Sequence, residues 1–194
     1  MIPRRLQYVV LVLVVAIFAM GGYLVHLKRK AEMVSLPLAT RLSAPVSGPA
    51  EMLLLYVADD QSGTLRQETI SQALPSDPGE RGRTALHALI ARCQQKDSPH
   101  PLPAGADVHE VFMMGPSSAV INLNAAFADG HRSGIGPEQL SLFSLVMTLR
   151  AQFPQLTRVR FLVEGKSRET LAGHVDLSSW YDTAAVAESA ASLK

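Results

Sequence analysis

Apolar positions are concentrated in one uninterrupted N-terminal run, whereas the rest of the chain alternates between apolar and polar residues in short patterns. The run extends from Leu6 to Val25 and reads LQYVVLVLVVAIFAMGGYLV. Only Gln7, Tyr8 and Tyr23 contribute polar side-chain atoms within it, all near its ends, and basic residues flank it at positions 4–5 and 28–30. A helix of about 20 apolar residues spans roughly 30 Å of hydrocarbon. The pattern therefore predicts a transmembrane anchor within residues 1–30.

A cleaved secretory signal is the alternative for this run. Signal peptides have a shorter apolar core, of about 7–15 residues, followed by a small-x-small cleavage site. Ala16 and Ala19 are not followed by such a site, and a basic cluster comes next. We expect an uncleaved single-pass anchor. The flanking charges slightly favour a cytoplasmic C-terminal part, but the N-terminal tail has no domain to translocate, so charge leaves the orientation open.

Beyond the anchor, the patterns separate a spacer, one domain and a tail. Residues 31–50 contain three prolines and no sustained periodicity, which is typical of a linker. Residues 182–194 are rich in alanine and serine, and we expect a flexible tail there. Residues 51–181 lie between them and suffice for one core.

Within this domain, periodicity and turn residues predict eight elements. Strands are expected at 52–58, 64–71, 108–114, 119–125, 158–164 and 171–177, with the first two forming a hairpin. One helix is expected to begin at Pro78, with Asp77 as its N-cap and Glu80 completing a capping box. A second begins at Pro137 and ends before Pro154. The order β-β-α-β-β-α-β-β indicates an α+β domain with two helices packed on one sheet.

The second helix has more apolar surface than one contact face needs. Besides its main stripe, it carries Leu140, Phe143 and Met147 at helical spacing. These three residues are candidates for an interaction surface with a protein partner, or else they fill the domain's own core.

Charge and motifs exclude several classes of function. Without the anchor's flanks, 13 basic residues stand against 17 acidic ones, a formal charge of −4, and no basic stripe predicts nucleic-acid binding. The six histidines show no metal-ligand spacing, and we read them as structural or exposed. No nucleophile elbow, phosphate loop or zinc-helix motif occurs. We therefore expect no catalytic residue, metal or cofactor, and no enzyme activity.

Residues 52–181 resemble the sporulation and spore germination (GerMN) domain. The resemblance is carried by Thr148-Leu149 with Phe153-Pro154, by Val163 with Gly165, and by the segment 173–178, which includes Asp176. Asn122 and Asn124 stand where the family's V-D-L-S strand has Asp and Ser. The resemblance implies a fold similar to ring-building motifs and an extracytoplasmic domain of the bacterial cell envelope. It shifts the expected orientation to a cytoplasmic N-terminus with the domain outside the plasma membrane.

Two functions follow from the anchor and the resemblance. The first is a non-catalytic envelope protein whose domain mediates protein–protein assembly, with itself or with another envelope protein. The alternative is a binding module for a cell-wall glycan or small ligand. That module would use a polar face around Asn122, Asn124 and Asp176, although Asp176 is also suited to supporting a turn.

Overall fold

Ten helices and strands follow one another in residues 48–192, which are the residues that the computed structural model describes. They are β1 (Ala50–Asp59), β2 (Thr64–Ala73), α2 (Pro78–Cys93), β3 (Val108–Met113), β4 (Ser118–Leu123), α3 (Ala125–Asp129), α4 (Ile135–Gln152), β5 (Arg158–Val163), β6 (Tyr181–Asp182) and α5 (Thr183–Ser192). All belong to one compact unit, Val46–Lys194. The predicted anchor, Leu6–Val25, and nearly all of the predicted linker lie outside the described residues. Among residues 48–192, no helix is long and apolar enough to cross a membrane.

The α+β class is confirmed, but the strands form two sheets rather than one. β1 and β2 pair only with each other in the described region, as an antiparallel hairpin. The second sheet has the order β3-β4-β5-β6, and only its β4–β5 pair is parallel. The prediction of one sheet is wrong because α4 occupies the second edge of β1. There Tyr56 N donates to Thr148 Oγ1 at 3.0 Å, and Ser144 Oγ donates to the Tyr56 carbonyl.

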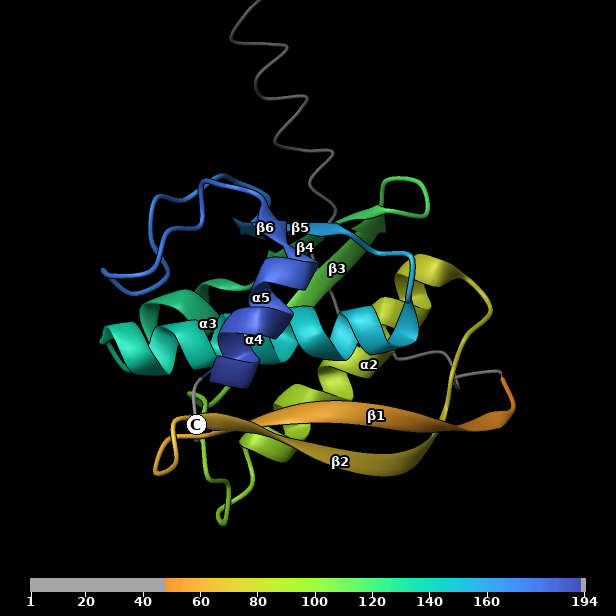
Figure 1. The fold of residues 1–194 in the computed structure, drawn as a ribbon, viewed down its shortest axis with the longest axis horizontal. Helices are drawn as coiled ribbons and strands as arrows, with labels where there is room; N and C mark the ends of the chain where they lie inside the picture. Colours follow the sequence, from red (N-terminus) through yellow and green to blue (C-terminus); the bar gives the residue numbers. More distant parts are fainter. Residues whose placement is uncertain (1–47, 193–194) are drawn as a thin grey trace, which may run out of the picture. The chain divides into compact units, whose positions relative to one another are not determined.

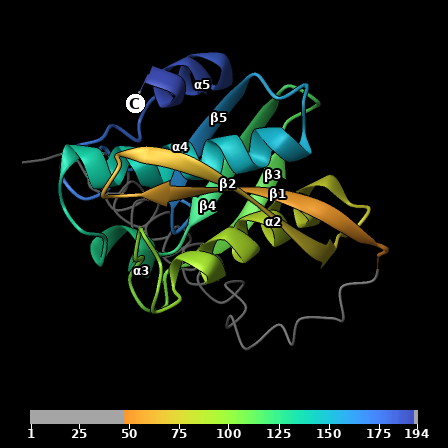
Figure 2. The same ribbon diagram turned by 60° about the horizontal axis from the view of Figure 1, so that its bottom comes forward.

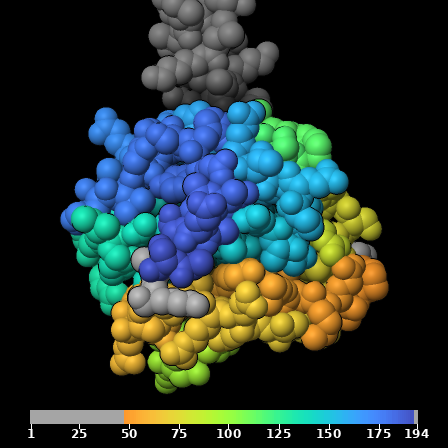
Figure 3. Space-filling view, viewed as in Figure 1, coloured from red at the N-terminus to blue at the C-terminus, as the bar shows by residue number. Residues whose placement is uncertain are grey.

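The two sheets enclose a helical layer (Figure 1). In Figure 2 the β1–β2 hairpin lies in front of α4 and α2, and the four-stranded sheet lies behind them. Figure 3 shows α5 lying across α4 at the molecule's front. Alternate residues of each sheet point into the helical layer, among them Leu53 and Leu55 of β1, Ile121 of β4 and Phe161 of β5, all at most 1% exposed. This three-layer arrangement explains the wide apolar surface of α4, which faces sheets on both sides.

The start of α2 confirms the predicted cap. The Asp77 side chain accepts a hydrogen bond from Glu80 N at 2.9 Å, and Pro78 is the first helical residue. The reciprocal half of the capping box does not form, because the Glu80 carboxylate pairs with Arg83 instead. The predicted apolar face of this helix, Ala85 to Cys93, is buried.

The C-terminal third departs most from the predicted elements. The strand expected at 171–177 is a loop with one isolated bridge, Thr170–Asp176, and the last strand is the short β6. The residues expected to form a flexible tail include helix α5, whose Thr183 and Val186 are buried. Asp182 caps this helix, accepting from Ala184 N and Ala185 N. The short helix α3 was not predicted at all.

Candidate functional site

A buried cluster of serine, histidine and aspartate residues joins four separate segments. His100, in the loop after α2, places Nδ1 2.7 Å from Asp60 Oδ1 in the β1–β2 turn. Its Nε2 lies 2.6 Å from Ser141 Oγ on α4. His131, in the loop before α4, places its own Nε2 2.6 Å from the same hydroxyl oxygen. Serine, histidine and aspartate in hydrogen-bond contact are also the residues of a catalytic triad, in which they act as nucleophile, base and acid. This cluster is therefore a candidate active site.

Counting donors and acceptors assigns the tautomer of each histidine ring. The Asp60 carboxylate and the Arg132 carbonyl only accept, so both Nδ1 atoms of the histidines carry hydrogen. The two Nε2 atoms then both face the Ser141 hydroxyl, which has a single hydrogen to donate. Burial lowers the pKa of His131.

The surroundings of Ser141 leave no room for a substrate. Ser141 is 3% exposed and His100 is 2% exposed. The cavity that both residues line measures about 10 Å³, close to the smallest volume that holds one water molecule. The geometry therefore suits a structural role, in which the side chains hold loops against α4, rather than acyl transfer. We call such a buried polar cluster a clamp.

A second buried clamp is centred on Glu138, in the first turn of α4. Its side chain is inaccessible to solvent and accepts hydrogen bonds from the backbone N–H groups of Gly134, Ala172, His174 and Val175, at 2.9–3.1 Å. The His174 ring adds a contact of 2.9 Å. Although burial by itself opposes ionisation, these hydrogen bonds hold the pKa of Glu138 at about 2. They also engage the backbone that a strand at 171–177 would have used for pairing.

Both clamps belong to one polar stripe on α4 that the sequence analysis missed. Glu138, Ser141, Ser144 and Thr148 are all buried, at most 3% exposed, and recur at helical spacing along an otherwise apolar helix. Glu138 and Ser141 bond loops, whereas Ser144 and Thr148 both bond Tyr56 of β1. Polar residues repeated every three or four positions inside an apolar helix are the signal that could have revealed them.

The three residues of the predicted polar face each bond nearby backbone, and ligand binding through them stays a prediction. Asn122 is 8% exposed, and its Oδ1 accepts from Gly165 N at 2.7 Å. Asn124 caps α3, accepting from Phe127 N and Asp107 N and donating to the Gly105 carbonyl. Asp176 accepts from Ser178 N at 2.7 Å, which is the turn-supporting role considered for it. Each side chain is thus occupied by local backbone.

The predicted interaction surface on α4 lies mostly inside the domain. Leu140 is 5% exposed and Phe143 is 6% exposed, whereas Met147 is half-buried and packs against the core. For the two buried residues, the alternative that they fill the domain's own interior matches their position. Binding of a partner through this stripe stays a prediction, with only Met147 partly accessible for it.

The remaining histidines and the cysteine take up separate positions. His87 contacts the Val108 carbonyl at 2.8 Å, and His109 contacts Glu164 Oε1 at 3.1 Å. Cys93 is 1% exposed, and burial raises the pKa of its thiol to about 12. No group of three metal-ligating side chains gathers within residues 48–192. His26 lies outside those residues.

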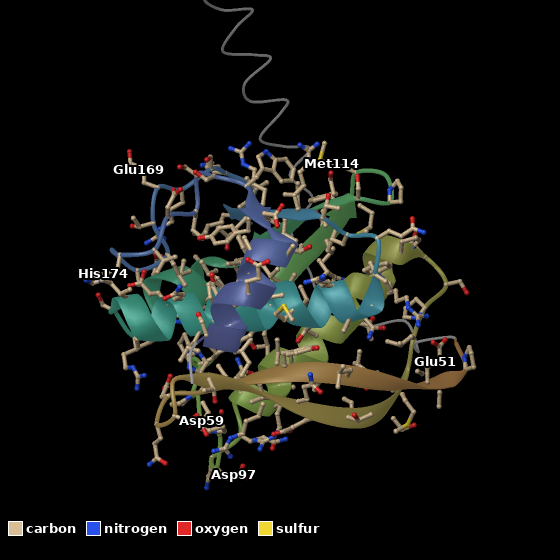
Figure 4. All side chains as sticks on the ribbon, viewed as in Figure 1. Glu51, Asp59, Asp97, Met114, Glu169 and His174 are labelled. Atoms are coloured by element: carbon tan, nitrogen blue, oxygen red, sulfur yellow. The ribbon has the colours of Figure 1, made fainter. Side chains whose placement is uncertain are left out.

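Exposed apolar side chains gather instead on the outer face of the four-stranded sheet. Phe112 is 47% exposed and Met114 is 59% exposed. Trp180, 38% exposed, directly precedes β6, with the guanidinium of Arg158 on β5 4.8 Å from the centre of its ring. Figure 4 places Met114 at the side of the molecule opposite Asp59 and Asp97. The register puts Phe112 and Met114 on the face that points away from α2 and α4.

A hollow of about 450 Å³ lies beside this face, at the β3–β4 turn. It is lined mainly by apolar residues from the start of α2, the β3–β4 turn and the end of α4, among them Pro78, Met113, Phe153 and Pro154. Its volume lies within the range of small-ligand pockets, roughly 300–1,000 Å³.

The comparisons with known proteins agree with the predicted resemblance. The sequence profile described as "Germane: Sporulation and spore germination" matches residues 54–169, well over half of the chain. A comparison with curated protein sequences gave no significant match.

Among solved structures, the tandem GerMN domains of the sporulation protein GerM from Bacillus subtilis match with a TM-score of 0.50 at 18% identity. That match covers 67% of this chain and 45% of the tandem protein. The first GerMN domain of the same protein matches at 20% identity with a TM-score of 0.45, covering 66% of this chain and 94% of that one. A Clostridium perfringens protein assigned as a lipoprotein matches at 24% identity with a TM-score of 0.47, covering 69% of this chain and 88% of the other.

The likeness to the tandem domains shows the fold. The profile match runs from within β1 to the loop after β5 and includes Glu138 and the Ser141 cluster, whereas the backbone at 172–175 that Glu138 binds lies beyond it. On this evidence, the chain belongs to the sporulation and spore germination (GerMN) family.

Proposed function

We propose that this chain is a membrane-anchored envelope protein whose GerMN domain mediates protein–protein assembly without catalysing a reaction. The observation that carries the proposal is a contrast within the domain. The serine–histidine–aspartate cluster is enclosed and fully occupied by structural contacts, whereas Phe112, Met114 and Trp180 are exposed on one side of the sheet. Aromatic residues, methionine and arginine are enriched in protein interfaces, and this side of the sheet carries all three kinds.

The proposal includes the location of the domain. Residues 1–30 would anchor the chain in the plasma membrane, and the domain would lie outside the cytoplasm. The apolar run from Leu6 to Val25 supports the anchor, and the family supports the side of the membrane. Carbonate extraction of membranes tests the anchor, and protease added to intact spheroplasts tests the side. Release of the protein by carbonate, or complete protection of the domain from protease, would contradict this part of the proposal.

Photocrosslinking of the full chain in its native membrane tests the assembly function. A photoreactive amino acid replaces Met114 in one variant and Met52 in the control. Met52 is also well exposed, at 72%, but lies on the β1–β2 hairpin. We expect discrete adducts of higher mass from position 114 and none from position 52. Absence of adducts at 114 would remove the proposal, and identical adducts at both positions would mark non-specific collision.

A small-ligand binding module is the second candidate function, favoured by the 450 Å³ hollow. Its apolar lining fits an apolar ligand better than a glycan, whose hydroxyl groups need hydrogen-bonding partners. Substitution Phe153→Ala tests it, because saturable binding of an apolar dye should weaken in this variant. Unchanged dye binding would exclude the hollow as the site.

A further inference from the structure

The outer face of the four-stranded sheet presents nine side-chain positions in a regular grid. In register, Glu110, Asn122 and Leu162 form one row across β3, β4 and β5. The second row is Phe112, Val120 and Arg160, and the third is Met114, Ser118 and Arg158. The alternate residues of the same strands, such as Val111, Ile121 and Phe161, are buried in the core. The grid is therefore the side of the sheet that points away from the helices, although Ser118 and Asn122 within it are at most 8% exposed.

Three of the four apolar residues in this grid lie on one diagonal, and the fourth, Phe112, lies beside it. Met114, Val120 and Leu162 run from corner to corner, and the two remaining corners carry opposite charges, Glu110 and Arg158. A two-fold axis lying along the apolar diagonal would bring each of the three residues against its own copy. The same rotation brings Glu110 of one copy near Arg158 of the other, twice per pair. This is the self-complementarity that a symmetric interface requires.

We infer that this face is a self-association surface, on which a second copy of the chain packs with its strands crossing steeply. Sheets pack face to face either nearly aligned or at roughly 90°, and the diagonal axis corresponds to the second mode. The inference rests on the proposed assembly function and names its partner as the chain itself. The two-fold operation places Arg160 opposite the Asn122 position of the second copy.

The size of the grid sets the expected strength of the pair. Three strands about 4.8 Å apart and five residues of about 3.4 Å each cover on the order of 250 Å². Stable dimers bury about 800 Å² per partner. Even with Trp180 at the border, we expect a weak pair that becomes populated when both copies are confined to one membrane.

A cysteine placed on the proposed axis gives a direct test. In the full chain in membranes, Val120→Cys should be joined to its own copy by a short bismaleimide. The matched control is Thr69→Cys, an exposed position on β2 that should give no dimer. Cys93 adds little background, because it is buried and its thiol has a raised pKa. Equal dimer yields at positions 120 and 69 would overturn the inference.

Charge reversal tests the predicted pairing of Glu110 with Arg158. Glu110→Arg alone, and Arg158→Glu alone, should each lower the crosslinked fraction of Val120→Cys about tenfold, because both symmetry-related pairs become repulsive. The double variant should recover most of the crosslink. Unfolding midpoints of the variants check that the fold is retained. If the double variant stays as weak as the single ones, the pairing is wrong.

The outcomes separate this inference from the proposed function. A photoreactive residue at 114 that captures a different protein, without a Val120→Cys homodimer, would keep the assembly function and overturn self-association. If neither the adduct at position 114 nor the Val120→Cys homodimer forms, both the assembly function and self-association are overturned.

Discussion

At the scale of single residues, buried polar side chains hold the loops of this domain in place. Glu138 is the clearest case, because one carboxylate receives four backbone N–H groups at the start of α4. The hydrogen bonds stabilise the ionised form, and the resulting pKa of about 2 lies well below the ordinary 4.5. A difference of that size corresponds to ~3 kcal/mol of folding free energy.

The substitution Glu138→Gln should therefore lower the free energy of unfolding by about 3 kcal/mol, since the amide loses the charge and turns a donor toward other donors. Chemical denaturation at neutral pH measures this difference. Glu169→Gln is the control, since Glu169 is an exposed residue of the loop that Glu138 holds. An equal loss of unfolding free energy in both variants would show that Glu138 does not stabilise the loop.

Glu138 also predicts a pH dependence of stability. A carboxyl whose pKa is lower in the folded than in the unfolded chain stabilises the fold above the unfolded pKa. That contribution is lost as the pH falls from about 4.5 through about 2. We expect the wild-type unfolding free energy to drop over this window more steeply than that of Glu138→Gln. Parallel curves for the two proteins would show that Glu138 does not titrate as described.

Ser141 offers a test of the second clamp. Replacing it with alanine leaves the buried Nε2 atoms of His100 and His131 without a partner, which should cost about 1–3 kcal/mol of stability. Ser71→Ala, on the exposed face of β2, should have almost no effect. Thermal unfolding of both variants decides between a structural role and a dispensable hydroxyl.

At the scale of elements, the sequence predicted those with a strong period and missed those without one. β1, β2, α2 and α4 have long apolar patterns or clear caps, and their positions agree with the prediction within a few residues. β6 has two residues, too few to show a period. The segment 171–177 alternates like a strand, but its backbone is bound by a carboxylate from another helix. Such tertiary competition is not visible in a local pattern.

The candidate sites depended even more on tertiary contacts. Asn122, Asn124 and Asp176 have the composition of a binding face, yet each one bonds backbone close to it in space. His100 and His131 are well separated in sequence and meet only because Ser141 on α4 lies between them. Exposure of Phe112 and Met114 likewise depends on which sheet face the helices cover.

Helix α5 supplies a prediction at this scale, because it replaces the expected flexible tail. Val186 is 4% exposed, and Thr183 Oγ1 donates to the Leu156 carbonyl at 2.7 Å. Val186→Ala removes two buried methyl groups and should cost about 1.5 kcal/mol at roughly 0.8 kcal/mol per group. Ala184→Ser, on the exposed side of α5, is the control in the same denaturation series. Equal stability of the two variants would mean that α5 is not docked.

At the scale of the whole molecule, the described residues form a continuous apolar core of their own. The apolar cluster includes β1 and α2, the four-stranded sheet and α5, all within one compact unit. We expect the fragment 48–194 to unfold cooperatively, with a midpoint within a few degrees of that of the full chain in detergent. Circular dichroism during heating measures both. Failure of the fragment to fold would assign residues 1–47 a part in the core.

The single parallel pair in the sheet has a consequence for how the chain acquires its structure. β4 can pair with β5 only after α3 and α4, which lie between them in the chain, have been synthesised. The sheet therefore forms late, through contacts between residues far apart in the sequence. A chain synthesised only as far as Phe153 exposes the backbone of Ser118–Leu123 as an open edge. Unfinished chains side by side can pair through that edge and aggregate. The interval before Arg158–Val163 emerges is therefore when this edge is open to pairing with another chain.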